Sequence, residues 1–334
     1  MSMRSIKFKI ARTFCWLDSD ATAKDSLSLS GRRPEFELDR LLPFAFLHLG
    51  CFFVFLTGTS NVALAIAALL YFVRMFAITA FYHRYFSHRS FKTSRIMQFL
   101  FAVIGLSAVQ RGPLWWAAHH RRHHRESDTE NDIHSPVARS FWWAHLGWLT
   151  SSQNMPTDYD AVQDFSKFPE LRFLNRFDWL VPSLLFIFLY GLGEYLSKNF
   201  PSLETSGPQL LVWGFFISTV VLFHATSSIN SLNHIFGSRR YNTDDNSKNN
   251  FILALITLGE GWHNNHHQYS HCVRQGFYWW EIDLTYYGLR VLSSLGLIYA
   301  LKPVPLPAYR TLEASELASA DLAPCRADVG GEQL

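Results

Sequence analysis

The sequence of 334 residues has few cysteines, little net charge and none of the common nucleotide-binding or zinc-protease motifs. No two cysteines form a CxxC pair, so neither a disulfide framework nor an iron–sulfur domain is indicated; the four are Cys15, Cys51, Cys272 and Cys325. HExxH and GxGxxG are also absent, which argues against a zinc protease and against a built-in nucleotide-dependent electron supply. The net charge is only +3, with Lys and Arg spread among aromatic residues, so a membrane surface is a better electrostatic partner than nucleic acid.

Long apolar runs are prominent instead. Hydrophobic residues make up 49% of the chain while the mean hydropathy is only +0.02, as expected of a protein partly in lipid and partly in water. Four runs could cross a bilayer, at residues 41–57, 61–82, 180–196 and 209–228. The second would be about 33 Å long as an α-helix, enough to span the hydrocarbon. Residues 97–110 are apolar but shorter, and we expect a helix near the interface there.

The distribution of positive charge predicts which side of the membrane each segment faces. The connections at residues 58–60 and 197–208 hold one lysine and no arginine, whereas residues 83–179 are rich in both. By the positive-inside rule, both termini and the long segments after the second and fourth spans are cytoplasmic. The prediction is an all-α integral membrane protein with four transmembrane helices and a cytoplasmic helical cap.

Both ends of the chain are expected to lie outside the membrane domain, which we place at residues 41–302. Residues 1–40 are expected to form a basic N-terminal segment. Its first 20 residues lack the continuous apolar stretch of a secretory signal, and their basic residues predict an amphipathic helix on the membrane surface. Residues 303–334 have little periodicity and are expected to form a disordered tail.

Histidines are numerous and grouped. Fifteen are present, and the motifs HRRHH and HNNHH space three of them at i, i+3 and i+4, on one face of a helix. His83 and His88 in HRYFSH are five residues apart, which fits an ideal helix less well and suggests a bend in the last turn of the second span. Asn230 precedes His234 by one helical turn and would point the same way. The nine candidate ligands are His83, His88, His120, His123, His124, His234, His263, His266 and His267.

The number of these histidines suits two metal ions better than one. Imidazole binds iron, zinc, copper and nickel, so the pattern leaves the metal open. The ligands follow the spans and are not buried within them, which argues against a metal transporter. His48, His145 and His271 stand alone and are expected to be packed or surface residues, while His119 and His224 stand beside the groups.

Taken together, the motifs HRYFSH, HRRHH, INSLNHIFG and GEGWHNNHH resemble those of the integral-membrane acyl-CoA desaturases, the stearoyl-CoA desaturase-like family in its bacterial branch. The resemblance covers residues 39–301. It implies two iron ions and O2 as co-substrate, with the nine histidines as ligands, not divided between the ions, and Asn230 holding an iron-bound water. It further implies carboxylates behind the ligands and residues that bend the acyl chain; these are Asp128, Glu130 and Asp132, and Gln110, Trp116 and Thr226.

The same resemblance implies a cis double bond in a saturated fatty acyl chain, at position 9 by default, and coenzyme A as the acyl carrier. Animal members have Arg-Asp before the second histidine motif, whereas this chain has Ala118-His119, so a lipid-esterified or carrier-protein-bound chain stays open. Arg111, Arg239 and Arg240 are candidates for meeting phosphates, or are simply solvated.

Electrons must come from outside the chain, because it has no motif for a redox cofactor of its own. We expect a separate ferredoxin-like donor and its reductase. Two other readings remain: a di-iron fatty acyl or alkane hydroxylase, and a membrane metal-binding or transport protein.

Overall fold

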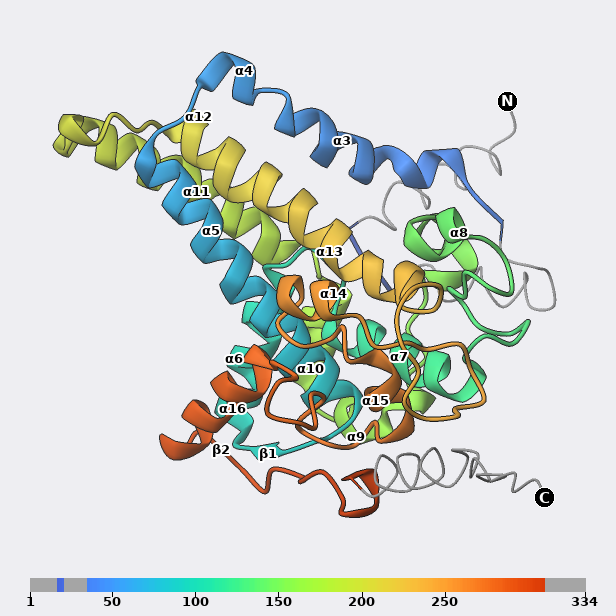
Figure 1. Ribbon diagram of the computed structural model, residues 1–334. Coiled ribbons are helices and arrows are strands. Elements are labelled where there is room, and N and C mark those ends of the chain that lie inside the picture. Colours follow the sequence, from blue (N-terminus) through green and yellow to red (C-terminus); the bar gives the residue numbers. More distant parts are fainter. Residues whose placement is uncertain (1–16, 21–34, 310–334) are drawn as a thin grey trace, which may run out of the picture.

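The structure is a computed structural model that describes residues 17–20 and 35–309. Most of the basic N-terminal segment, residues 1–40, and most of the expected tail, residues 303–334, lie outside the described residues. The described part is almost entirely helical (Figure 1). One pair of two-residue strands, β1 (Lys92–Thr93) and β2 (Ile298–Tyr299), is antiparallel with Lys92 opposite Tyr299.

Four helical segments are long and apolar enough to cross a membrane, which confirms the prediction of four spans. They cover Leu38–Thr57, Asn61–Ser87, Leu180–Asn199 and Gly207–Leu232. Their elements are η2 (Leu38–Leu41), α3 (Leu42–Cys51) and α4 (Val54–Thr57); α5 (Asn61–Phe76) and η3 (Ala77–Ser87); α11 (Leu180–Asn199); and α12 (Gly207–Leu210), η8 (Leu211–Ile217) and α13 (Ser218–Leu232).

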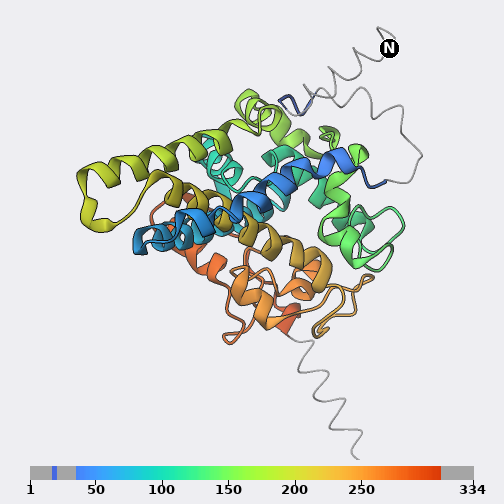
Figure 2. The same cartoon turned by 90° about the horizontal axis from the view of Figure 1, so that it is seen from above.

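The spans form two hairpins whose turns are set by local sequence. Gly58 ends α4 with φ +67°, a conformation that glycine adopts without strain, and the Ser60 hydroxyl accepts a hydrogen bond from the Ala63 amide to cap α5. Ser60 also lies 2.9 Å from the Thr205 hydroxyl, so the turns of the two hairpins touch. Figure 2, seen from above, shows the first span running alongside the fourth.

The second and fourth spans pack around a buried arginine. Arg74 is fully buried, and its guanidinium donates to the Thr219 hydroxyl at 2.7 Å, to the Ser218 hydroxyl and to the Gly214 carbonyl at 3.3 Å. A charge inside the bilayer is tolerated only when it faces the protein interior and its donors are satisfied. These contacts therefore fix the second span against the fourth.

The remaining elements form a cap at one end of the spans, with the α4 turn at the other end (Figure 1). The cap helices are α6 (Arg95–Leu106), α7 (Pro113–Glu126), α8 (Phe141–His145), α9 (Gln163–Ser166), α10 (Pro169–Arg176), α14 (Phe251–Ile256), α15 (His263–Gln268) and α16 (Leu284–Ser294). Short 3-10 turns are η4 (Gly147–Thr150), η5 (Ser152–Asn154), η6 (Asp160–Val162) and η7 (Pro201–Leu203), the last of them in the second hairpin turn. The short apolar run expected near residues 97–110 is α6.

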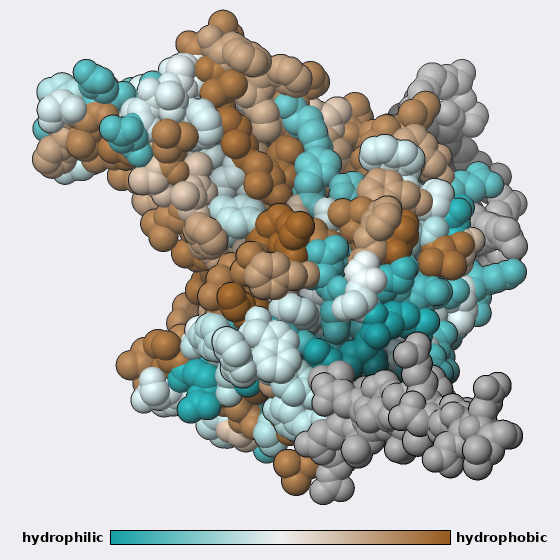
Figure 3. Space-filling view, in the orientation of Figure 1, coloured by the Kyte–Doolittle hydropathy of each residue, from teal (hydrophilic) through white to brown (hydrophobic). Residues whose placement is uncertain are grey.

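Hydrophobicity divides the surface in the same way. Brown, hydrophobic side chains cover the span helices and teal, hydrophilic ones gather over the cap (Figure 3). On α11, Leu184, Ile187 and Phe188 are exposed, as expected of a helix that faces lipid. At the other end of the chain, Ala308 is buried and its carbonyl accepts from the Tyr241 hydroxyl at 2.7 Å. Residues 303–309, which we expected in the tail, are thus packed onto the cap.

Candidate metal centre

All nine candidate histidines converge where the second span meets the cap, and they do so in two groups. In each group the ring nitrogens lie within 4.8 Å of one another. The first group is His83, His88, His120, His124 and His266. The second group is His123, His234, His263 and His267. Segments more than 180 residues apart in sequence therefore meet at one place.

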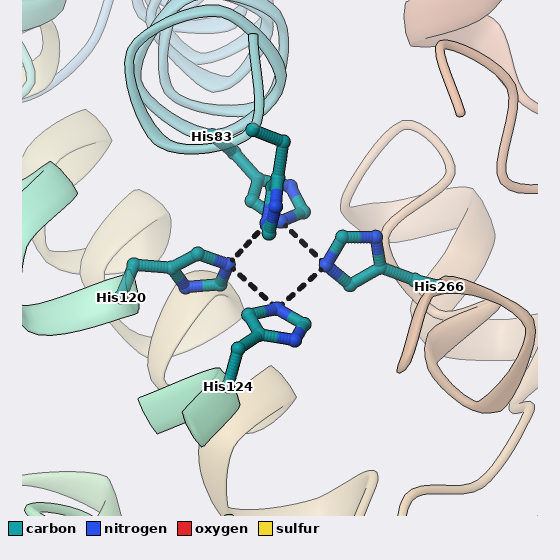
Figure 4. Close-up of side chains that lie close together, drawn as sticks. His83, His120, His124 and His266 are labelled. Carbon is teal, nitrogen blue, oxygen red and sulfur yellow. Dashed lines mark hydrogen bonds between the residues drawn. The ribbon is translucent and has the colours of Figure 1, made fainter. Parts of the chain in front are cut away.

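In the first group the Nε2 atoms face one another (Figure 4). His266 lies 2.9 Å from both His83 and His124, and His120 lies 3.0 Å from His124 and 2.8 Å from His88. A ring nitrogen either donates one proton or offers one lone pair. Each Nε2 atom can therefore take part in only one hydrogen bond, so at most two of these four contacts can be hydrogen bonds. If all five atoms instead direct a lone pair at one cation, each has a partner, so the arrangement fits a metal ion.

The second group contains buried nitrogens that lack any partner. His234 Nε2 lies 3.1 Å from His263 Nε2. The Nε2 atoms of His123 and His267 are buried and have no hydrogen-bond partner within the described part of the chain. An unsatisfied buried ring nitrogen is costly, and a metal ion at the group would satisfy it.

Helix geometry explains why each HxxHH motif contributes to both groups. Consecutive residues of an α-helix are rotated by roughly 100°, so the residues at i+3 and i+4 point to opposite flanks of one face. On α7, His120 and His124 join the first group and His123 joins the second. On α15, His263 and His267 join the second group and His266 joins the first. Each helix thus lies between the two groups.

The end of the second span departs from α-helical geometry, as His83 and His88 suggested. The segment η3 is a π-helix, in which a backbone amide donates to the carbonyl five residues earlier. The His88 amide donates to the His83 carbonyl at 3.2 Å, and the two rings have centroids 4.8 Å apart. The wide turn, rather than a bend, brings both rings to the first group.

Carboxylates hold four of the nine rings from behind. Nδ1 of His123 lies 3.0 Å from Asp132, Nδ1 of His234 lies 2.9 Å from Asp128, and Nδ1 of His83 lies 2.5 Å from Glu260. Nδ1 of His267 contacts Asp245. With the proton on Nδ1, each Nε2 presents its lone pair to the group.

The histidines also keep these acids ionised. Burial alone would raise the pKa of Asp128 and Asp132, but His234 beside the first and His123 beside the second lower both pKa values well below the ordinary value. Of the three carboxylates expected after the second motif, the structure places Asp128 against His234 and Asp132 against His123. Glu130 differs: it is exposed on the turn between them, because that turn faces solvent at its apex.

Three residues near the groups were missed by sequence reasoning. Glu260 stands three positions before His263 within GEGWHNNHH, so its place in the motif was a usable signal. Asp245 lies in the polar loop 241–250, where nothing in the sequence distinguishes it from its neighbours. His134 is buried with its ring 4.2 Å from that of His123, and burial lowers its pKa to about 3.

A cavity of about 610 Å³ is lined both by histidines of the two groups and by residues of the spans. Gln110, Trp116 and Thr226 all line it. The Gln110 side-chain amide donates to the Thr226 hydroxyl at 2.9 Å, and the Trp116 ring is stacked on His120 with centroids 4.9 Å apart. The three residues expected to shape an acyl chain are therefore brought together beside the first group, in what we name the acyl cavity.

Asn230 and three of the candidate ligands line the same cavity. Asn230 lies in the last turn of α13, just before His234, which follows the helix. His83 and His120 of the first group and His263 of the second line the cavity as well. A molecule in the cavity thus meets both groups.

The residues considered for a head group lie in several places. Ala118 and His119 are buried, and the His119 Nδ1 donates to the Trp115 carbonyl at 2.9 Å. Arg111 lines the acyl cavity but is paired with Asp178 at 3.1 Å. Arg240 is paired with Glu281, and exposed Arg239 donates to the Thr243 carbonyl at 2.7 Å.

The histidines outside the groups are packed or exposed, as expected. His48 Nε2 lies 3.0 Å from His224 Nε2, and His224 Nδ1 lies 2.9 Å from His145 Nε2. His145 in turn contacts the Ser231 hydroxyl at 3.0 Å. His271 is exposed. The rings of His48, His224 and His145 thus connect α3, α13 and α8.

Comparison with known proteins agrees with the geometry. The fatty acid desaturase family model matches residues 59–294. The acyl-CoA C20 Delta5-desaturase of Anemone leveillei is 36% identical over 259 residues, 77% of this chain and 78% of that protein. The sn-1 stearoyl-lipid 9-desaturase of Anabaena variabilis is 35% identical over 273 residues, 81% of this chain and 95% of that protein.

A third relative, the Delta-9 acyl-lipid desaturase 1 of Arabidopsis thaliana, is 38% identical over 240 residues, 72% of this chain and 75% of that protein. The names of these relatives cover acyl-CoA and acyl-lipid substrates and more than one position. What these names share is fatty acyl desaturation. This chain belongs to the fatty acid desaturase family.

Proposed function

We propose that this protein is an O2-dependent di-iron desaturase that introduces a cis double bond into a saturated fatty acyl chain. The observation that carries the proposal is the acyl cavity, because it is mostly apolar, is lined by residues of the spans and is lined by histidines of both groups. Position 9 is the default that the family resemblance implies. An unactivated chain has no polar handle near the reacting carbons, so the shape of the cavity selects the bond.

Iron is the metal we assign to both groups. Zinc also binds imidazole, but it has no redox chemistry and cannot support an oxidation. The nine histidines are the proposed ligands, with Asn230 acting through a bound water. When bound, the iron would supply the reduction of O2 coupled to removal of two hydrogens from adjacent methylenes. The reaction consumes O2, two electrons and two protons, and yields the alkene and two waters.

The contribution of the chain is to hold ligands and substrate in position. The four carboxylates fix the tautomers of His83, His123, His234 and His267 so that Nε2 stays available. Trp116, stacked on His120, forms the wall against which the acyl chain would lie. The Gln110–Thr226 hydrogen bond joins two lining residues of the cavity at the proposed bend. We place the cap and the centre on the cytoplasmic side, from the distribution of Lys and Arg.

The acyl carrier has two candidates. Coenzyme A is what the family resemblance implies. A lipid-esterified chain is favoured by one feature of the cavity: its lining includes Phe46 of α3 and Ile187 of α11, which are 57% and 67% exposed on the lipid-facing surface. Such an opening would admit a chain sideways from the bilayer. Pulse labelling distinguishes the two, since new alkene appears first either in acyl-CoA or in intact phospholipid.

The test of the function is gas chromatography with mass spectrometry of double-bond adducts, from cells with and without this protein. We expect a new cis-monoene, abolished by His123→Ala while the variant still inserts in membranes. A hydroxylated product without an alkene would support the hydroxylase instead. Metal uptake without O2 consumption would support a metal-binding or transport protein.

A further inference from the structure

A second cavity, of about 750 Å³, reaches the first group from outside the acyl cavity. We name it the basic pocket, because its lining contains seven cationic side chains and one carboxylate, Asp164. The seven are Arg89, Lys92, Arg95, Arg121, Arg125, Lys167 and Lys302. The acyl cavity has no such excess of charge of one sign.

The basic pocket ends on metal-ligand candidates. His88 and His124 line it, whereas His83, His120 and His263 line the acyl cavity, and the two cavities share no lining residue. The centre can therefore be approached from two separate sides. A partner in the basic pocket would come within one imidazole ring of the first group without meeting the acyl chain.

The positive charge of the pocket is only partly neutralised. Asp164 is already engaged by Arg121 at 2.8 Å and by Arg89 at 3.5 Å. Lys92 and Lys302 are exposed, and within the described ranges neither has a carboxylate at ion-pair distance. Electrostatic complementarity of this kind steers an acidic partner and fixes its orientation.

The place of the pocket suits a soluble partner. It is lined by residues of β1 and α9, which lie at the end of the molecule away from the α4 turn (Figure 1). The histidines would separate an acyl head group in this pocket from a chain in the acyl cavity, because the two cavities share no lining residue. The proposed reaction needs two electrons from outside the chain, and the basic pocket gives a donor an approach to the first group that does not cross the acyl cavity.

We propose that the basic pocket is the docking surface for an acidic, soluble one-electron carrier protein of the [2Fe–2S] ferredoxin class, with His88 and His124 at the point of electron entry. This rests on the proposed function. Two docking events per turnover deliver two electrons: each reduced carrier leaves oxidised by one electron, and the two protons come from water.

The test uses the full chain, iron-loaded and purified in detergent, with an oxidised plant-type [2Fe–2S] ferredoxin as the probe. The variant is Lys92→Glu combined with Lys302→Glu; the control is Lys198→Glu, an exposed lysine at the opposite end, in α11. We expect the double variant to raise the Kd for ferredoxin at least tenfold at low salt, and the control to leave it unchanged. Iron content and circular dichroism verify that both variants are folded.

Two reductants separate docking from chemistry. With reduced ferredoxin the double variant should form alkene at least tenfold more slowly, and with dithionite in a single turnover it should match the wild type. Equal Kd values for variant and wild type, or an equal loss in the control, would overturn the proposal. So would a variant that loses binding to vesicles of anionic phospholipid while it keeps ferredoxin binding. If wild type yields no alkene with either reductant, the proposed function fails, while the Kd comparison still tests the docking surface.

Discussion

The Nδ1 atom of His123 lies 3.0 Å from Asp132 Oδ2, while the Nε2 atom of the same buried ring has no partner anywhere in residues 17–20 and 35–309. One side of the ring is thus fixed by a carboxylate and the other is left for a metal ion. The same division holds for His267, between Asp245 and an unsatisfied Nε2. This relationship is the basis of the first prediction.

Replacing Asp132 by Asn should weaken metal binding at the second group. The amide cannot hold the His123 proton on Nδ1 as a carboxylate does, and loss of such a partner typically costs 10- to 100-fold in metal affinity. Iron per chain after dialysis against a chelator measures the effect. Glu130→Gln is the matched control, because Glu130 is exposed on the same turn. Equal iron retention by both variants would argue against the role of Asp132.

Changing Thr226 to Val should alter the position or chain-length preference of desaturation. Valine keeps the shape of threonine but removes the hydroxyl that accepts from Gln110 at 2.9 Å. Without this hydrogen bond, Gln110 is no longer held in place at the proposed bend of the cavity. Adduct mass spectra of the products report the double-bond position. Ser228→Ala, two residues along the same helix, should leave the product unchanged. An unaltered product from Thr226→Val would remove this residue from the specificity argument.

Arg84→Met should destabilise the protein strongly. Arg84 is buried and donates to Glu260 and Asp283 at 3.0 and 2.9 Å, so its loss leaves two buried carboxylates without their cation. Breaking a buried pair in this way typically costs about 3–5 kcal/mol. Thermal unfolding in detergent measures it. Arg290→Met, at an exposed position, should change the midpoint by little, and a similar midpoint for both variants would contradict the prediction.

The protein should lose stability in mild acid. Burial lowers the pKa of His119 to about 4, and burial together with the His224 ring lowers that of His145. The unfolded chain takes up these protons below its ordinary pKa of about 6.5, whereas the folded chain does not. The free energy of unfolding therefore falls as the pH falls from about 6.5 toward 4.

Unfolding midpoints at pH 7.5 and pH 5 check this prediction. His119→Phe keeps a ring against Trp115 and should reduce the drop between the two pH values. Exposed His271→Gln should leave the drop as it is. A drop that is the same in all three proteins would show that His119 does not contribute.

The architecture and the grouping of histidines could be predicted because both depend on local pattern. Apolar runs long enough for a bilayer gave the spans, and the i, i+3, i+4 spacing indicated one helix face for His120, His123 and His124. The division of that face between two groups depends on what surrounds the helix in space. For that reason the partition emerged only from the structure.

The contacts behind the ligands were harder to foresee. Asp128 and Asp132 follow their histidine motif closely in sequence, so their position near the ligands could be predicted. Asp245 approaches His267 across a loop, and loop conformation is not encoded in hydrophobic periodicity. The basic pocket likewise assembles residues from β1, α7 and the segment after β2, which no single stretch of sequence contains.

The measurement that tests the central claim most directly is iron per chain in the anaerobically loaded, full-length protein, by mass spectrometry of the metal. The account predicts two irons in the wild type and one in His123→Ala, with the first group still filled. A single iron in the wild type, or two in His123→Ala, would contradict it.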